Sequence, residues 1–135
     1  MCRVILYCRV STDEQTEGCS IEMQERCLNA YCSNKGDTIV ATYYEDYSAK
    51  NFDNKMPEIK KIYNYCKKQS NEVAKVLFLR WDRYARNVEF AFAYKRMLYD
   101  ELHVEINAIE SPIDFAGTEW PLLWQCIAER LIPRT

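Results

Sequence analysis

Two short polar stretches, each directly after an apolar run, contain residues whose types and spacing suit chemistry on an anion. In the first stretch, Arg9 and Ser11 lie two positions apart. In the second, Asp82 precedes two arginines that lie three positions apart, Arg83 and Arg86. A guanidinium group presents several donors in one plane and matches phosphate oxygens, and a serine beside such groups is a candidate nucleophile. The pattern predicts a phosphate site if the fold brings the two stretches together.

The spacing within each stretch supports this interpretation. Alternation along a strand places Tyr7, Arg9 and Ser11 on one side, and a helical turn places Arg83 and Arg86 on one face. Three guanidinium groups around a serine would stabilise the negative charge of a phosphoryl-transfer transition state. Taken singly, Ser11 also fits a turn or a helix cap, and the second stretch also fits the start of a helix. Spacing alone therefore indicates a candidate phosphate site and no more.

The elements that must position these residues follow from the hydrophobic pattern. It predicts a polar loop over 45–56, strands over 3–10, 38–44, 75–81 and 104–109, and helices over 20–35, from Pro57 onward, over 88–102 and over 119–131. Alternating strands and helices predict an α/β fold, with a mainly parallel sheet of four to five strands and helices on both faces. Ligands of such sheets bind at the carboxyl ends of the strands, where both polar stretches would lie.

Composition excludes several classes of protein. The 135 residues suffice for one domain, and the net charge of −2 is unlike that of a self-sufficient DNA-binding domain. The only histidine, His103, precedes the predicted fourth strand and is not placed to act as a base for Ser11, so a Ser-His-Asp hydrolase is not expected. The seven cysteines show no C-x-x-C spacing, so we expect no metal site, and they fit a reducing cytoplasm. With three glycines and no long apolar run, neither a Gly-rich phosphate loop nor a membrane span is expected.

The motifs resemble those of a known family. "YCRVSTDEQ" resembles the Y-x-R-V-S-T-x-x-Q opening of the serine recombinases, the resolvase/invertase family, and "VLFLRWDRYARN" resembles that family's strand followed by D-R-x-x-R. "EDYSAKNF" and "SPIDF" resemble further stretches in the same order, so the resemblance covers nearly the whole chain. "GCSIEMQ" is similar to the G-x-S-I-x-x-Q of large serine recombinases from transposons and phages.

The resemblance implies a site-specific DNA recombinase. Residues 1–135 would form a resolvase-like catalytic domain, with the family's C-terminal DNA-binding region absent. Ser11 would attack a DNA phosphodiester and become joined to the 5′ end, before strand exchange and rejoining, without metal or cofactor. Arg9, Arg83 and Arg86 would hold the phosphate. Other positions match the aspartate beside these arginines and supporting residues of the family, namely Asp82, Tyr7, Gln15, Gln24 and Lys55.

The resemblance also implies partners, and one departure leaves alternatives open. The expected partners are double-stranded DNA and further copies of the chain, as a homodimer that joins into a tetramer, in the cytoplasm and associated with DNA. Met56 stands where the family usually has an arginine before proline, and Lys55 is the nearest cation. The alternatives are a non-catalytic recombinase remnant or interaction module, and an unrelated α/β domain that binds phosphate.

Overall fold

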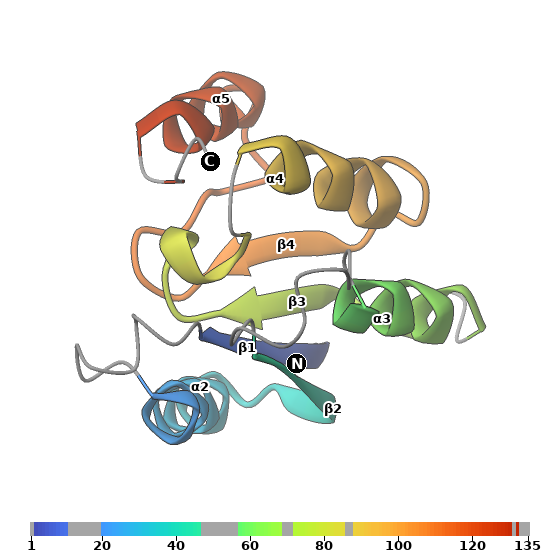
Figure 1. The fold of residues 1–135 in the computed structure, drawn as a ribbon, viewed down its shortest axis with the longest axis vertical. Helices are drawn as coiled ribbons and strands as arrows, with labels where there is room; N and C mark the ends of the chain where they lie inside the picture. Colours follow the sequence, from blue (N-terminus) through green and yellow to red (C-terminus); the bar gives the residue numbers. More distant parts are fainter. Residues whose placement is uncertain are drawn as a thin grey trace.

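A single parallel sheet organises the chain in a computed structural model, which describes residues 2–10, 20–46, 57–68, 72–85, 88–130 and 132. Its strands lie in the order β2-β1-β3-β4 and pair in parallel throughout (Figure 1). Their bounds are Arg3–Val10 for β1, Thr38–Asp46 for β2, Lys75–Phe78 for β3 and Glu105–Ala108 for β4. The predicted α/β fold with a parallel sheet is confirmed.

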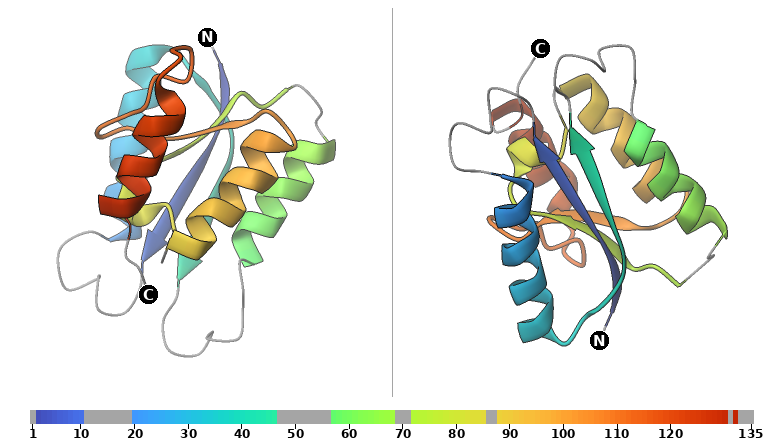
Figure 2. Two further views of the ribbon diagram at one scale, coloured as in Figure 1. Left: turned by 90° about the horizontal axis from the view of Figure 1, so that it is seen from above. Right: turned by 60° about the horizontal axis from the view of Figure 1, so that its bottom comes forward.

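Helices cover both faces of this sheet, as the alternating pattern predicts. Helix α2 packs on one face, and α3 and α4 pack on the other (Figure 2). The helical segments are α2 (Ile21–Lys35), α3 (Pro57–Lys68), the 3-10 turn η2 (Trp81–Arg83), α4 (Val88–Lys95), the π-helical turn η3 (Arg96–Asp100) and α5 (Trp120–Arg130). Within the described ranges, none of these helices has the length and apolar character needed to cross a membrane.

Strand β1 is buried on both sides, which explains its continuous apolar run. Val4 and Leu6 belong to a small core beneath α2, where Leu28 lies. Ile5 and Tyr7 belong to a larger core on the opposite face, together with residues of α3, α4 and α5. The side-chain alternation therefore places Arg9 on the side of the larger core, next in line after Tyr7.

Helix α2 begins and ends at the residues that the sequence indicates. The Ser20 hydroxyl accepts a hydrogen bond from the Met23 backbone N–H at 3.2 Å, which satisfies one of the free donors of the first turn. At the other end, Gly36 adopts a left-handed conformation with a φ of 77°, which glycine adopts without steric cost. These caps fix the length of the helix that carries Gln24.

Two predicted elements end earlier than the sequence suggests. The strand predicted over 75–81 ends at Phe78, and the chain then bends into η2. Leu79 and Trp81 are buried although they lie outside the sheet. The apolar run therefore continues past the end of the strand, which is why the sequence predicts a longer strand. The helix predicted over 88–102 is α-helical only to Lys95 and continues as the π-helical turn η3. The other described boundaries lie within two residues of the prediction.

Candidate active site

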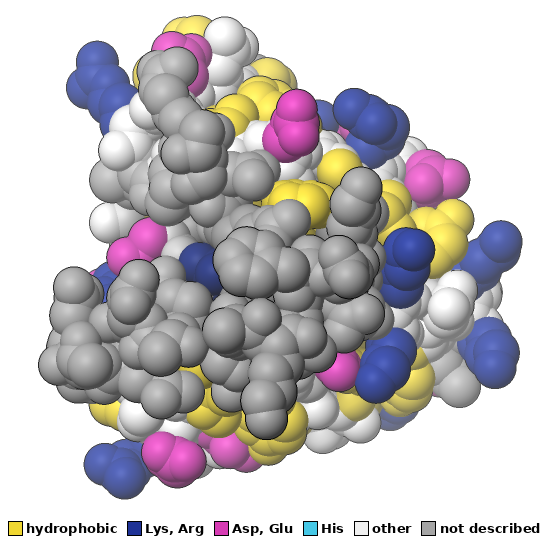
Figure 3. All heavy atoms as spheres, viewed as in Figure 1, with side chains coloured by type: hydrophobic (Ala, Val, Ile, Leu, Met, Phe, Trp, Pro, Cys, Tyr) yellow, Lys and Arg dark blue, Asp and Glu magenta, His cyan; other side chains and the backbone are white. Residues whose placement is uncertain are grey.

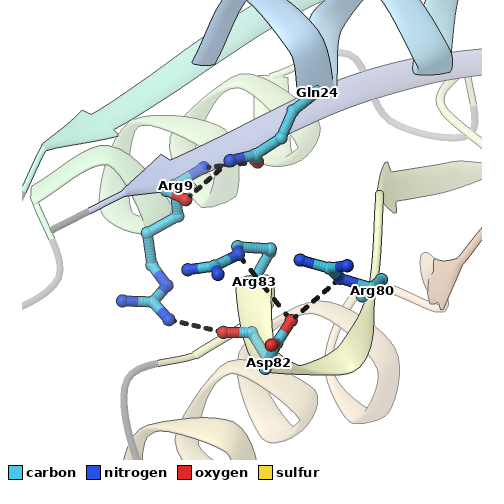
Figure 4. A network of polar contacts seen from close by, with 5 residues as sticks. All are labelled: Arg9, Gln24, Arg80, Asp82 and Arg83. Atoms are coloured by element: carbon cyan, nitrogen blue, oxygen red, sulfur yellow. Dashed lines mark hydrogen bonds and ion pairs between the residues drawn. The ribbon is translucent and has the colours of Figure 1, made fainter. Parts of the chain in front are cut away.

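The ends of β1 and β3 bring the two polar stretches together. These strands are direct neighbours, with Leu6 opposite Leu77, so their carboxyl ends lie at one edge of the sheet. The turn η2 then directs the chain toward the end of β1, where the Arg9 Nη2 donates a hydrogen bond to the Asp82 carbonyl oxygen at 2.5 Å (Figure 4). Arg83 extends into the same space from the turn (Figure 4). Arg9, Asp82 and Arg83 thus lie together, although they come from distant parts of the sequence.

Four of the predicted site residues lie outside the described part of the chain. They are Ser11, Gln15, Lys55 and Arg86. Ser11 directly follows Val10, the last residue of β1, and Arg86 directly follows Ala85, which is buried. The described residues therefore form the frame from which Ser11 and Arg86 continue.

Two positively charged side chains of the site, Arg9 and Arg83, are buried close together. Arg9 is 2% exposed and Arg83 is 3% exposed. The Asp82 carboxylate lies 3.7 Å from Arg83 Nε and 3.5 Å from Arg80 Nε, and its side chain is 44% exposed. Burial of a guanidinium group is costly unless an anion or acceptors compensate its charge. The Asp82 carboxylate, which is partly exposed, is shared by Arg80 and Arg83 and supplies part of the compensating negative charge.

Gln24 fixes the backbone at Arg9 from helix α2. Its side-chain oxygen accepts from the Arg9 N–H at 3.1 Å, and its side-chain nitrogen donates to the Arg9 carbonyl at 3.0 Å (Figure 4). Alternate residues of a strand direct their backbone groups toward the same neighbouring strand, so Arg3 and Arg9 both face β3. The Arg3 carbonyl accepts a hydrogen bond from the Ala74 backbone N–H on that side. The pairing of β1 with β3 stops at Leu6. The Gln24 amide therefore takes the place of a β3 residue and holds the backbone of β1 at Arg9.

Trp81 holds the turn η2 against the core by a hydrogen bond and by ring packing. Its indole N–H donates to the Ser111 carbonyl at 2.9 Å, and its ring packs against Phe78, Tyr84 and Trp124 at centroid distances of 5.0–5.8 Å. Edge-to-face contacts of this kind add to the burial of the rings. Beside the turn lies a pocket of about 220 Å³, lined by Arg80, Trp81, Asp82, Glu110 and Ser111. Asp82 and Arg83 are therefore held on a turn that is packed into the core.

The sequence reasoning missed two charged residues of this region. Arg80 was assigned to the interior of a strand, but it lies on the bend and pairs with Asp82. Glu45 was assigned to a loop, but it lies in β2, directly opposite Arg9, and is 5% exposed. Burial raises the pKa of Glu45 to about 7. A charged residue just after a predicted strand was the available signal, but only the strand order places Glu45 beside Arg9.

Two buried thiols, Cys8 on β1 and Cys66 near the end of α3, are poor candidates for the nucleophile. Burial raises the pKa of Cys8 to about 12 and that of Cys66 to about 11. Since the thiolate is the reactive form, both stay protonated near neutral pH. In the part of the chain that the structure describes, no cluster of three or more His, Cys, Asp or Glu side chains is arranged to hold a metal ion.

A family comparison agrees with this architecture. The sequence model described as "Resolvase, N terminal domain" matches residues 4–129. The chain belongs to the resolvase family. The resemblance of this resolvase-family chain to the serine recombinases is thereby confirmed. No curated protein matches its sequence.

Three solved structures to which this resolvase-family chain is similar are recombinases or their catalytic domains. The N-terminal catalytic domain of TP901-1 integrase shows a TM-score of 0.72 at 21% identity, over 94% of this chain and 92% of that one. A resolvase family site-specific recombinase from Streptococcus pneumoniae shows 0.73 at 25% identity, over 96% and 87%. The C-terminal catalytic domain of ISC1926 TnpA, an IS607-like serine recombinase, shows 0.59 at 22% identity, over 96% and 98%. The chain has the fold of these catalytic domains.

Proposed function

We propose that the chain is the catalytic domain of a site-specific DNA recombinase with Ser11 as its nucleophile. The observation that carries the proposal is the contact of Arg9 with the Asp82 carbonyl, which joins the end of β1 to the turn that holds Arg83. Two nearly buried guanidinium groups, those of Arg9 and Arg83, are thus brought together, and Arg9 precedes Ser11 by two residues in the sequence. Membership of the resolvase family supports the same reaction class.

In this mechanism the Ser11 oxygen attacks the phosphorus of a DNA phosphodiester. The bond from phosphorus to the 3′ oxygen breaks, the serine proton is lost, and the leaving 3′ oxygen takes up a proton. The product is a 5′-phosphoserine link and a free 3′ hydroxyl, and the reverse attack rejoins a strand after exchange. The free energy of the broken ester is kept in the new ester, so the reaction needs no ATP.

The arginines supply charge to this reaction. Arg9, Arg83 and Arg86 donate to the non-bridging phosphate oxygens, where negative charge builds up in the transition state. Asp82 orients Arg83, and Gln24 fixes the strand that ends at Ser11. Tyr7, Gln15 and Lys55 are proposed as supporting residues. Tyr7 is fully buried on β1, two residues before Arg9.

The partners proposed are double-stranded DNA and further copies of the chain, which act as a dimer and exchange strands as a tetramer. Lysine and arginine side chains lie along the side of the molecule over α3 and α4 in Figure 3, and α3 carries exposed lysines at 60, 61, 67 and 68. Each phosphate neutralised by such a residue adds affinity that falls with salt. Because the 135 residues carry a net charge of −2, we expect them to bind DNA only weakly by themselves.

A tethered cleavage assay tests the proposal. The complete chain is joined at its C-terminus to a sequence-specific DNA-binding domain and incubated with duplexes that carry two sites for that domain around a randomised centre. Denaturing electrophoresis then detects protein joined to DNA. We expect an adduct with the unmodified chain and with Ser33→Ala, which changes an exposed serine of α2, but none with Ser11→Ala.

Two outcomes would overturn the proposal. An adduct that persists in Ser11→Ala would assign the nucleophile to another residue. Absence of any adduct with the unmodified chain, with DNA binding through the tether verified, would favour a non-catalytic interaction module instead.

A further inference from the structure

Glu45 lies on β2, the neighbour of β1 opposite to β3 and the turn η2 that follows it. Glu45 and Arg9 are directly opposite each other in the parallel pairing of β1 with β2, as Tyr7 and Tyr43 are two positions earlier. Neighbouring strands lie about 4.8 Å apart, and opposite residues project to the same face. Both residues are nearly buried, Arg9 at 2% exposed and Glu45 at 5%. An acidic and a basic residue are thus buried opposite each other on adjacent strands, and the Arg9 charge favours the Glu45 carboxylate.

The same carboxyl group also binds the start of helix α3. The Glu45 Oε1 accepts a hydrogen bond from the Glu58 backbone N–H at 3.1 Å, in the first turn of that helix. The first turn of a helix has free N–H groups and a partial positive charge, so it favours a carboxylate. Glu45 therefore joins three elements, since it lies on β2, borders Arg9 of β1 and binds α3.

Opposing effects bring the two protonation states of Glu45 close in free energy. Burial, the largest effect, and the Glu58 charge favour the neutral form, whereas the Glu58 N–H, Arg9 and Lys61 favour the carboxylate. The result is a pKa of about 7. Near neutral pH, a modest change of charge beside Arg9 is therefore sufficient to move a proton on or off this group.

We propose that Glu45 is a positioning residue for Arg9, whose counter-charge it supplies in the anion-free chain, and that it takes up a proton from solvent when a phosphate or sulfate anion binds beside Arg9. Two anions next to one buried guanidinium group repel each other, and protonation removes that repulsion. Binding of the anion and binding of the proton then strengthen each other by the same factor. The identification of this anion as a DNA phosphate rests on the proposed function, whereas the coupling of Arg9 to Glu45 does not.

Sulfate is the probe for the test, because its charge does not change between pH 6 and 8.5. Nuclear magnetic resonance follows the Arg9 side-chain N–H and the Glu58 amide of the complete chain during sulfate titrations across this range. We expect the sulfate affinity of the unmodified chain to fall about tenfold as the pH rises, which corresponds to a rise of one unit in the Glu45 pKa when the anion binds.

Three variants separate charge from structure. Glu45→Gln keeps an acceptor for the Glu58 N–H but has no charge, so its affinity should stay at the low-pH value throughout. Glu45→Asp keeps an ionisable group and should keep a pH dependence. Glu105→Gln removes one negative charge at the opposite edge of the sheet, where β4 begins, and should behave like the unmodified chain.

A sulfate affinity of the unmodified chain that is constant with pH would overturn the inference, whether or not the Gln variant folds. So would a pH dependence that Glu45→Gln retains in full. The proposed function is tested separately. If sulfate binding depends on pH but no Ser11 adduct forms, the coupling of Arg9 to Glu45 stands and the recombinase function is refuted. An adduct together with pH-independent sulfate binding reverses that conclusion.

Discussion

Replacement of Gln24 by methionine should destabilise the chain strongly, although the two side chains have similar length. The change removes both hydrogen bonds that Gln24 makes to the Arg9 backbone, at 3.1 and 3.0 Å. Gln24 is fully buried, so the Arg9 N–H and carbonyl would lose their partners in a dry environment. Each orphaned group costs about 1–3 kcal/mol. Because methionine leaves little cavity, we expect the free energy of unfolding to fall by about 2–4 kcal/mol in total.

Urea unfolding at equilibrium, with the slope compared between variants, measures this loss. Gln125→Met makes the same chemical change at an exposed position of α5, and it should alter the free energy of unfolding by less than about 0.5 kcal/mol. A loss below about 1 kcal/mol for Gln24→Met would refute the inference that the Gln24 amide replaces a strand partner of β1.

Three further changes test other parts of the structure. The raised pKa of Glu45 means that the folded chain keeps a proton that the unfolded chain releases, so this contribution to stability is complete below about pH 4.5 and is lost as the pH rises to about 7. Glu45→Gln should therefore become more stable relative to the unmodified chain between pH 5 and pH 8, by up to about 3 kcal/mol in urea unfolding; a constant difference would contradict this. Ser20→Ala removes the cap of α2 and should cost about 1 kcal/mol in the same assay, unlike Ser33→Ala. Trp81→Phe removes the donor to the Ser111 carbonyl and should cost about 1–3 kcal/mol; an unchanged midpoint would show that this bond is unimportant.

The sequence predicted the fold well because its signals are local. Alternating strands and helices, the Ser20 cap and the Gly36 end each follow from residues close together in the chain. The end of β3 was wrong, because Leu79 and Trp81 are as apolar as strand residues but bury their side chains outside the sheet. An apolar run predicts that its side chains are buried. It does not predict whether a neighbouring strand or another part of the fold buries them.

The candidate site was predictable only in part, for a related reason. The proximity of Arg9, Asp82 and Arg83 was predictable because parallel strands place their carboxyl ends at one edge, and the pairing of β1 with β3 satisfies that condition. The role of Gln24 required knowledge that the β1–β3 pairing stops short of Arg9. Glu45 required the strand order, which places β2 rather than another strand on the far side of β1. These are long-range facts that spacing within one sequence does not contain.

Peptide mapping of the covalent product by tandem mass spectrometry tests the central claim most directly. The tethered chain is trapped on cleaved DNA, digested with protease and nuclease, and searched for a peptide that carries a nucleotide through its 5′ phosphate. A modified Ser11, lost when Arg83 is changed to alanine, is the predicted result. A nucleotide attached to any other residue, or to Ser11 at full yield without Arg83, would contradict the claim that the arginines at the ends of β1 and β3 direct a phosphate to that serine.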